Sequence, residues 1–207
     1  MYIRTPHREE DTTKILEFIS QNEFATLVTY DGEKPIGTHL LLSTEPNETG
    51  EITLEGHMAR ANPQWKTFEN REVLVIFFGA HAYLSPTWYT EPDKSVPTWN
   101  YISAHVYGVP HIVEDETELL GLMKKLVGKY ESNSGYKLDN LPPDFLVKQL
   151  KGIVGFRIEV TRIEASYKLA QTLDSQSFQN VIVQLEKSED ENSRKIAEAM
   201  REKEEIK

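Results

Sequence analysis

The stretch FATLVTYDGEKPIGTHLLLS, residues 24–43, decides the fold class. Residues 24–30 and 36–43 each read as a β-strand, and a short turn separates them. Asp31-Gly32 is the expected pivot of that turn. Strands joined this closely pair antiparallel, so the stretch predicts a hairpin and argues against a parallel sheet built from βαβ units.

The rest of the chain extends this pattern. We expect further strands at 51–57, 72–79 (continued by 81–85 past a bend at Gly79), 100–113 with a break near 108–110, and 152–165. The run at 72–79 is almost continuously apolar, which predicts that both of its faces are covered. We expect helices at 11–21, 63–69, 115–131, 142–151, 174–186 and 188–206, and a loop at 44–50. The fold class is therefore α+β, mainly β: an antiparallel barrel with peripheral helices.

Composition restricts the function. The 207 residues include no cysteine, which excludes disulfides and thiolate chemistry and fits a reducing, cytoplasmic location. No apolar run is long enough for a transmembrane helix, so we expect no membrane partner. The net charge is −10 and no basic run stands out, which disfavours direct, tight DNA binding.

Common catalytic motifs are missing. The sequence has no GxGxxG, P-loop, GxSxG or HExxH pattern, and no pair of carboxylates is placed for acid–base work. The six histidines lack close metal-ligand spacing, so we assign no metal site and no catalytic residue. His39 and His57 could meet across neighbouring strands, where hydrogen bonding is the more common role.

The segment GHMARANPQW, residues 56–65, is the first candidate binding site. Asn62 suits the N-cap of a helix and Pro63 its first position. A helix N-terminus attracts phosphate, and the planar fork of Arg60 can hold two phosphate oxygens. The alternative is structural: Asn62-Pro63 merely begins a helix, and Arg60 pairs with a nearby glutamate. These residues alone favour the structural alternative.

A second candidate is a set of aromatic side chains between residues 83 and 101. These rings are costly to expose, so they cover a ligand, line a dimer interface or plug the barrel, unless they simply fill the core. The members are Tyr83, Trp88, Tyr89, Trp99 and Tyr101.

Several long blocks also resemble a known family. MYIRTPHREED, FATLVTYDGEKPIGTHLLL, EGHMARANPQW, VLVIFFGAHAYLSPTWY, VPTWNY and IVGFRIEVTRIEASYKLAQ occur in the order found in PaiB-type FMN-binding negative transcriptional regulators. The blocks span positions 1 to about 171. We therefore expect an FMN-binding domain at 1–171 and a C-terminal helical extension at 172–207. Tyr167 and Ala170 stand where the family has Trp and Ser, while Lys168 and Gln171 match.

The resemblance implies a split β-barrel that forms a homodimer and binds FMN in a cleft between subunits. It implies that residues 60–62 hold the phosphate, that the strand edge at 38–40 meets the isoalloxazine ring, and that residues of the aromatic region approach the cleft. The candidate cofactor-binding residues are Thr38, His39, Leu40, His57, Arg60, Ala61, Asn62, Tyr83, Ser85, Trp88 and Trp99.

The family resemblance also implies repression of sporulation and of extracellular protease synthesis. A flavin-binding regulator without turnover of its own is one hypothesis. A flavin-dependent oxidoreductase with an indirect regulatory effect is the alternative, and a split barrel that binds haem or another ligand is a third. If Arg60 faces the FMN phosphate, Arg60→Ala should weaken FMN binding more than riboflavin binding and change fold stability little.

Overall fold

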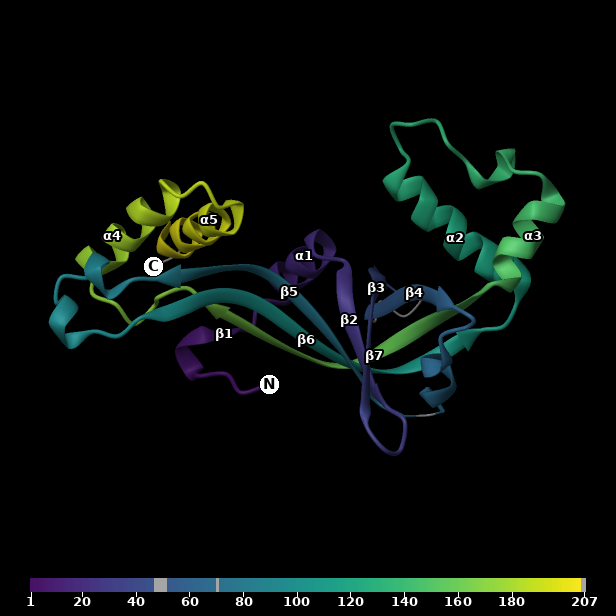
Figure 1. The fold of residues 1–207 in the computed structure, drawn as a ribbon, viewed down its shortest axis with the longest axis horizontal. Coiled ribbons are helices and arrows are strands. Elements are labelled where there is room, and N and C mark those ends of the chain that lie inside the picture. Colours follow the sequence, from purple (N-terminus) through teal and green to yellow (C-terminus); the bar gives the residue numbers. More distant parts are fainter. Residues whose placement is uncertain (47–51, 70, 206–207) are drawn as a thin grey trace. The chain divides into compact units, whose positions relative to one another are not determined.

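The computed structural model describes residues 1–46, 52–69 and 71–205, and Figure 1 traces the chain. Its strands are β1 (Arg8–Glu9), β2 (Phe24–Tyr30), β3 (Pro35–Pro46), β4 (Ile52–Ala59), β5 (Val73–Leu84), β6 (Thr98–Val113) and β7 (Ile153–Lys168). Its helices are α1 (Thr12–Gln21), α2 (Glu116–Tyr130), α3 (Pro143–Lys151), α4 (Ser175–Glu186) and α5 (Glu191–Glu205). Short 3-10 helices are η1 (Thr5–His7), η2 (Pro63–Thr67), η3 (Pro86–Trp88), η4 (Pro92–Lys94) and η5 (Leu138–Asn140).

The strands form one sheet that closes on itself. Their order is β1-β7-β4-β3-β2-β5-β6, and β6 also pairs with β7. The pairings of β2 with β3 and β5, of β3 with β4, and of β7 with β1 and β4 are all antiparallel. The predicted α+β class with an antiparallel barrel and peripheral helices is therefore confirmed.

The hairpin at 24–43 forms as predicted. β2 pairs with β3 from Phe24 opposite Leu41 to Tyr30 opposite Pro35. The Asp31 carboxylate accepts the backbone N–H groups of Glu33 and Lys34, both at 2.8 Å. The turn needs a positive φ, and Gly32 supplies it at 103°. Local turn chemistry therefore fixes the register of the hairpin.

The chain divides into two compact units. The first unit contains residues 1–18, 77–105 and 164–207, and the second contains residues 19–76 and 106–163. Fully buried side chains form the core of each. In the first unit they include Phe77, Leu84, Leu169, Ile182 and Ile196. In the second unit they include Leu27, Leu42, Leu54, Phe156 and Ile158.

Helices complete each unit. Within the second unit, α2 packs its buried residues Leu119, Leu122 and Met123 beside Val113, with α3 as its neighbour. Within the first unit, α4 packs against α5 and η3. The predicted boundary between residues 171 and 172 stays a prediction. No helix in the described ranges combines the length and apolarity needed to cross a membrane.

Several sequence-based expectations about the strands were wrong. β5 and β6 run without interruption through the expected bend at Gly79 and the expected break at 108–110. Gly108 marks a close crossing instead, because a Cβ there would lie 2.4 Å from the carbonyl oxygen of Glu159 on β7. This chain does not cover both faces of the apolar run at 72–79, since Phe78 is 54% exposed.

The loop expected at 44–50 begins later than predicted, because β3 continues to Pro46. Residues 47–51, which hold the rest of that loop and the first residue of the strand expected at 51–57, lie outside the described residues.

Candidate functional site

The junction between β4 and η2, residues 60–62, lies in the second unit. The Asn62 side chain accepts the backbone N–H of Gln64 at 3.0 Å, which caps η2, and Pro63 occupies the first position as predicted. Its Nδ2 donates to Thr38 Oγ1 at 3.0 Å. Because Thr38 accepts this bond, its own O–H remains available as a donor. η2 is a five-residue 3-10 helix rather than the predicted helix over 63–69, so its dipole is small.

Gln64 fixes this junction to the hairpin. Its side chain is fully buried, and its Nε2 donates to the backbone carbonyls of Leu27 at 3.1 Å and Ile36 at 3.2 Å. Gln64 was not among the predicted site residues, since a single glutamine gives no sign that its amide will bridge two strands. Its bonds hold η2, and therefore Asn62, at a fixed place beside β3.

Arg60 has a structural role at the same junction. Its Nε donates to the carbonyl of Lys151 at 2.8 Å and its Nη2 to the carbonyl of Ile153 at 2.7 Å. Its backbone N–H donates to the carbonyl of Gly152 at 2.8 Å. Carbonyls at a helix C-terminus lack partners within the helix. Arg60 provides donors for Lys151, the last residue of α3, for its C-cap Gly152, and for Ile153, the first residue of β7. Arg60 therefore has a structural role, as the alternative favoured by the sequence expects, but its partners are backbone carbonyls rather than a glutamate.

Three donors remain at this turn. In the described part of the chain, Arg60 Nη1 and the backbone N–H of Ala61 have no hydrogen-bond partner. The Thr38 hydroxyl is the third. Arg60 and Ala61 are exposed and Thr38 is partly exposed. A guanidinium edge, a backbone N–H and a hydroxyl are donors that suit a phosphate, so the residues present fit that group.

Two histidines lie on the strands next to this turn. His39 Nδ1 is 2.9 Å from Thr26 Oγ1, and its exposed ring stacks on Phe24 with 6.5 Å between ring centroids. His57 on β4 has a buried Nδ1 without a partner among the described residues, and burial lowers its pKa. The two rings do not meet; His39 instead pairs with Thr26, the hydrogen-bonding role that the sequence favours. Leu40 is 7% exposed, which leaves its backbone as the part that a ligand could meet.

The remaining candidates lie in the first unit. Trp99 packs edge-on against Tyr83 with centroids 5.9 Å apart, and His81 lies 6.0 Å from Trp99 and 5.1 Å from Phe78. Phe78, Tyr83 and Trp99 are each about half exposed, at 54%, 47% and 53%. We call these four residues the aromatic strip. Phe78 and His81 were not among the predicted site residues, because the continuous apolar run around Phe78 does not show which of its faces is exposed.

Ser85 and Trp88 lie beyond the aromatic strip at η3. The Ser85 hydroxyl caps η3 by accepting the backbone N–H of Thr87 at 3.3 Å, and it lies 2.8 Å from Thr87 Oγ1. Trp88 is partly buried, and the neighbouring Tyr89 is buried at 9% exposure. Both candidates therefore have local structural roles, and their roles toward a cofactor stay predictions.

A closed antiparallel sheet with helices at its margins, and with a phosphate-compatible turn after β4, defines a split β-barrel of the FMN-binding type. The chain belongs to the family described as "Putative FMN-binding domain", which matches residues 1–162. It is 41% identical over 206 residues to "Protease synthase and sporulation protein PAI 2" of Bacillus subtilis (strain 168), and the match covers 98% of each chain.

Solved structures have the same fold. The flavocytochrome Anf3 from Azotobacter vinelandii matches with a TM-score of 0.62 and 11% identity, over 77% of this chain and 68% of that one. The FAD and heme binding protein from Mycobacterium smegmatis matches with a TM-score of 0.61 and 10% identity, over 78% of this chain and 73% of that one. Likeness at such low identity establishes the split-barrel fold.

Proposed function

We propose that the chain binds FMN. The phosphate would lie at residues 60–62, where it meets Arg60 and Ala61 beside Asn62 and the Thr38 hydroxyl, and the ring would meet the strand edge at residues 38–40. The observation that carries this proposal is the set of three available donors held at one turn by Gln64 and Asn62. A bound FMN supplies a redox-active ring. The chain's own contribution is to bind the phosphate and orient the ring.

The test is a titration of purified protein with FMN, followed by flavin fluorescence and by the absorption spectrum. We expect saturable binding of one FMN per chain, with flavin bands in the near-ultraviolet and blue. A protein that neither carries a flavin nor binds FMN saturably would contradict the proposal. A Soret band in its place would favour the haem alternative.

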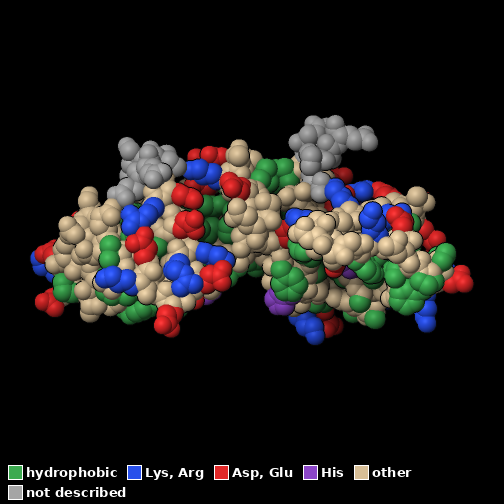
Figure 2. All heavy atoms as spheres, turned by 90° about the horizontal axis from the view of Figure 1, so that it is seen from above, with side chains coloured by type: hydrophobic (Ala, Val, Ile, Leu, Met, Phe, Trp, Pro, Cys, Tyr) green, Lys and Arg blue, Asp and Glu red, His purple; other side chains and the backbone are tan. Residues whose placement is uncertain are grey.

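We further propose that the protein is a negative regulator of sporulation and protease synthesis. Support comes from the family resemblance and from the 41% identity to a relative whose name refers to both processes. Net charge disfavours direct, tight DNA binding, and Lys and Arg side chains are interspersed with Asp and Glu on the face drawn in Figure 2. We place the protein in the cytoplasm. NAD(P)H oxidation by the FMN-loaded protein would favour the oxidoreductase alternative.

A homodimer is part of this proposal. The aromatic strip leaves three large rings about half exposed in the single chain, an arrangement typical of an interface. We propose that a second copy covers it and that Tyr83, Ser85, Trp88 and Trp99 reach the flavin cleft from this side. An obligate interface buries more than about 2,000 Å². Light scattering at micromolar concentration should give about twice the chain mass of 23.8 kDa, and a monomeric mass would contradict the proposal.

A further inference from the structure

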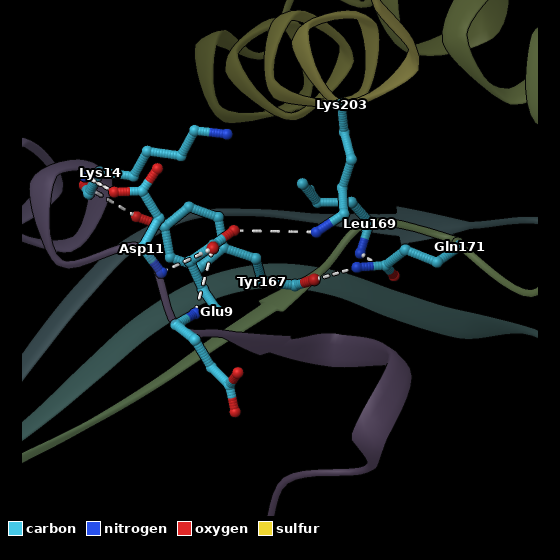
Figure 3. Close-up of polar contacts among 8 residues, drawn as sticks. Glu9, Asp11, Lys14, Tyr167, Leu169, Gln171 and Lys203 are labelled. Carbon is cyan, nitrogen blue, oxygen red and sulfur yellow. Dashed lines mark hydrogen bonds and ion pairs between the residues drawn. The ribbon is translucent and has the colours of Figure 1, made fainter. Parts of the chain in front are cut away.

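The turn after β7, in the first unit, is held in one conformation. The Gln171 side chain donates through Nε2 to the carbonyl of Tyr167 and accepts the backbone N–H of Leu169 at 2.8 Å (Figure 3). Ala170 has a positive φ of 59°, a conformation that L-residues adopt at a cost. The backbone polar groups of this turn are therefore satisfied locally, and the position of Lys168 is fixed.

The N-terminal segment runs beside this turn. β1 pairs antiparallel with β7, with Arg8 opposite Ser166 and Glu9 opposite Ala165. Just before Arg8 lies η1, which follows its N-cap Arg4 and ends at His7, so both residues adjoin the end of the β1–β7 pairing, two positions from Lys168. His7 is 6% exposed, and its backbone N–H donates to the carbonyl of Arg4 at 2.8 Å. Arg4, His7 and Lys168 thus come together from the two ends of the sequence.

The positive charges at this place lack matching carboxylates. Lys168 is partly buried, and its Nζ donates to the neutral hydroxyl of Thr98 at 2.5 Å. Burial, and then the charge of Arg4, lower the pKa of Lys168. Burial, and then the charges of Lys168, Arg4 and Lys203, lower the pKa of His7.

Two of the carboxylates near this place, Glu9 and Glu164, already have partners. Glu9 accepts the backbone N–H groups of Glu10 and Asp11 and lies 3.8 Å from Lys203 Nζ (Figure 3). Glu164 pairs with the amino group of Met1. No carboxylate among the described side chains pairs with Lys168 or Arg4. Burial, and then Glu9, Glu17 and Asp11, raise the pKa of the neighbouring Tyr167, whereas burial and then Arg4 lower the pKa of Lys168. The excess of positive charge is therefore confined to Lys168, Arg4 and His7.

We propose that Lys168, Thr98, Arg4 and His7 form a binding site for a phosphate group, carried by free phosphate or by a small phosphate monoester. An ammonium, a guanidinium, a hydroxyl and an imidazole offer several donors to a tetrahedral oxoanion. The Thr98 hydroxyl accepts from Lys168 and keeps its own proton to donate. This site stands on residues outside the turn at 59–62, so it does not rest on flavin binding there.

The test follows the imidazole resonances of His7 by NMR, assigned with His7→Gln. Inorganic phosphate is titrated into the full chain at neutral pH, with chloride replaced so that ionic strength stays constant. We expect a saturable shift in the wild type. Lys168→Met, which keeps the alkyl stem, should weaken phosphate affinity by about tenfold or more. Lys148→Met, which removes an exposed lysine from α3, is the charge-matched control and should bind as the wild type does.

A second variant guards against loss of fold. Arg4 is exposed, so Arg4→Met should fold normally and still weaken phosphate binding. A titration with glycerol 3-phosphate distinguishes a phosphate monoester from free phosphate as the ligand. A higher affinity for glycerol 3-phosphate than for inorganic phosphate would point to a monoester, and equal affinities would point to the free ion. A His7 shift that rises linearly without saturating, or that is the same in Lys168→Met and Arg4→Met as in the wild type, would overturn the proposal.

Discussion

Arg60 and Lys168 are two cations at the C-terminal ends of strands, and their surroundings differ. Arg60 follows β4 beside the open C-terminus of α3, and its guanidinium donates to two backbone carbonyls there. Lys168 ends β7 at a turn whose backbone is satisfied by Gln171, so its ammonium donates to the Thr98 hydroxyl. Backbone carbonyls without partners next to a cation thus take up its N–H donors, and the donors that they do not take up remain for a ligand.

The largest expected effect concerns the structural half of this comparison. Arg60→Ala removes two charge-assisted bonds near the end of α3, and should lower the free energy of unfolding by about 1–3 kcal/mol. The side chain is exposed, which keeps the loss from being larger. Arg60→Lys should recover part of the loss, because an ammonium cannot reproduce the fork. Urea unfolding measures both. Arg71→Ala, a change at an exposed arginine of the same unit, is the control, and a loss of equal size there would contradict the account.

The cap of η2 should contribute next. Asn62→Ala removes both the bond from Gln64 and the bond to Thr38, and should cost about 1 kcal/mol of unfolding free energy. Asn62→Asp keeps an acceptor for the cap and loses only the donor to Thr38, so it should cost less. Equal losses in the two variants, measured by urea unfolding, would show that the cap contributes little.

Acid should weaken the fold through histidines that are buried or partly buried. Burial lowers the pKa of His57, so the unfolded chain takes up the proton first as pH falls. The stability that neutral His57 contributes is complete above the unfolded value of about 6.5 and is lost as pH falls below it, by at most about 1.4 kcal/mol per pH unit. The pKa values of His7 and His105 are lowered too, mainly by burial, and act in the same direction. His57→Gln should flatten the pH dependence of the unfolding free energy, and an unchanged slope would refute this reading.

The smallest effect concerns the turn that fixes Lys168. Ala170→Gly relieves the positive φ at 59° but adds freedom to the unfolded chain, so we expect a net gain of about 0.5 kcal/mol in unfolding free energy. Thermal unfolding would detect it. A clear loss of stability would mean that the Ala170 side chain contributes packing that outweighs the backbone cost.

Local features of the sequence were good guides to structure. The alternating hairpin at 24–43, the turn at Asp31-Gly32 and the cap at Asn62 each depend on neighbours within a few residues, and all three formed as predicted. The partners of Arg60 are more than ninety residues away in sequence, at Lys151 and Ile153, so no local pattern could show them.

The proposed phosphate site around Lys168 could not be predicted from the sequence for the same reason. Arg4, Thr98 and Lys168 come from three separate segments, and only the pairing of β1 with β7 and the bond from Lys168 to Thr98 bring them together. The apolar run around Phe78 shows a related limit. A continuous run predicts that both faces are covered, but it does not say whether the cover comes from the same chain or from another.

The most direct test of the flavin proposal compares FMN with riboflavin in Arg60→Ala. Both flavins need the same folded protein, so the ratio of their affinities cancels any general damage to the fold. If the turn at residues 60–62 holds the phosphate through Nη1, FMN affinity should fall about tenfold more than riboflavin affinity. Equal losses for the two flavins would contradict the account and leave Arg60 with its structural role at the end of α3 alone.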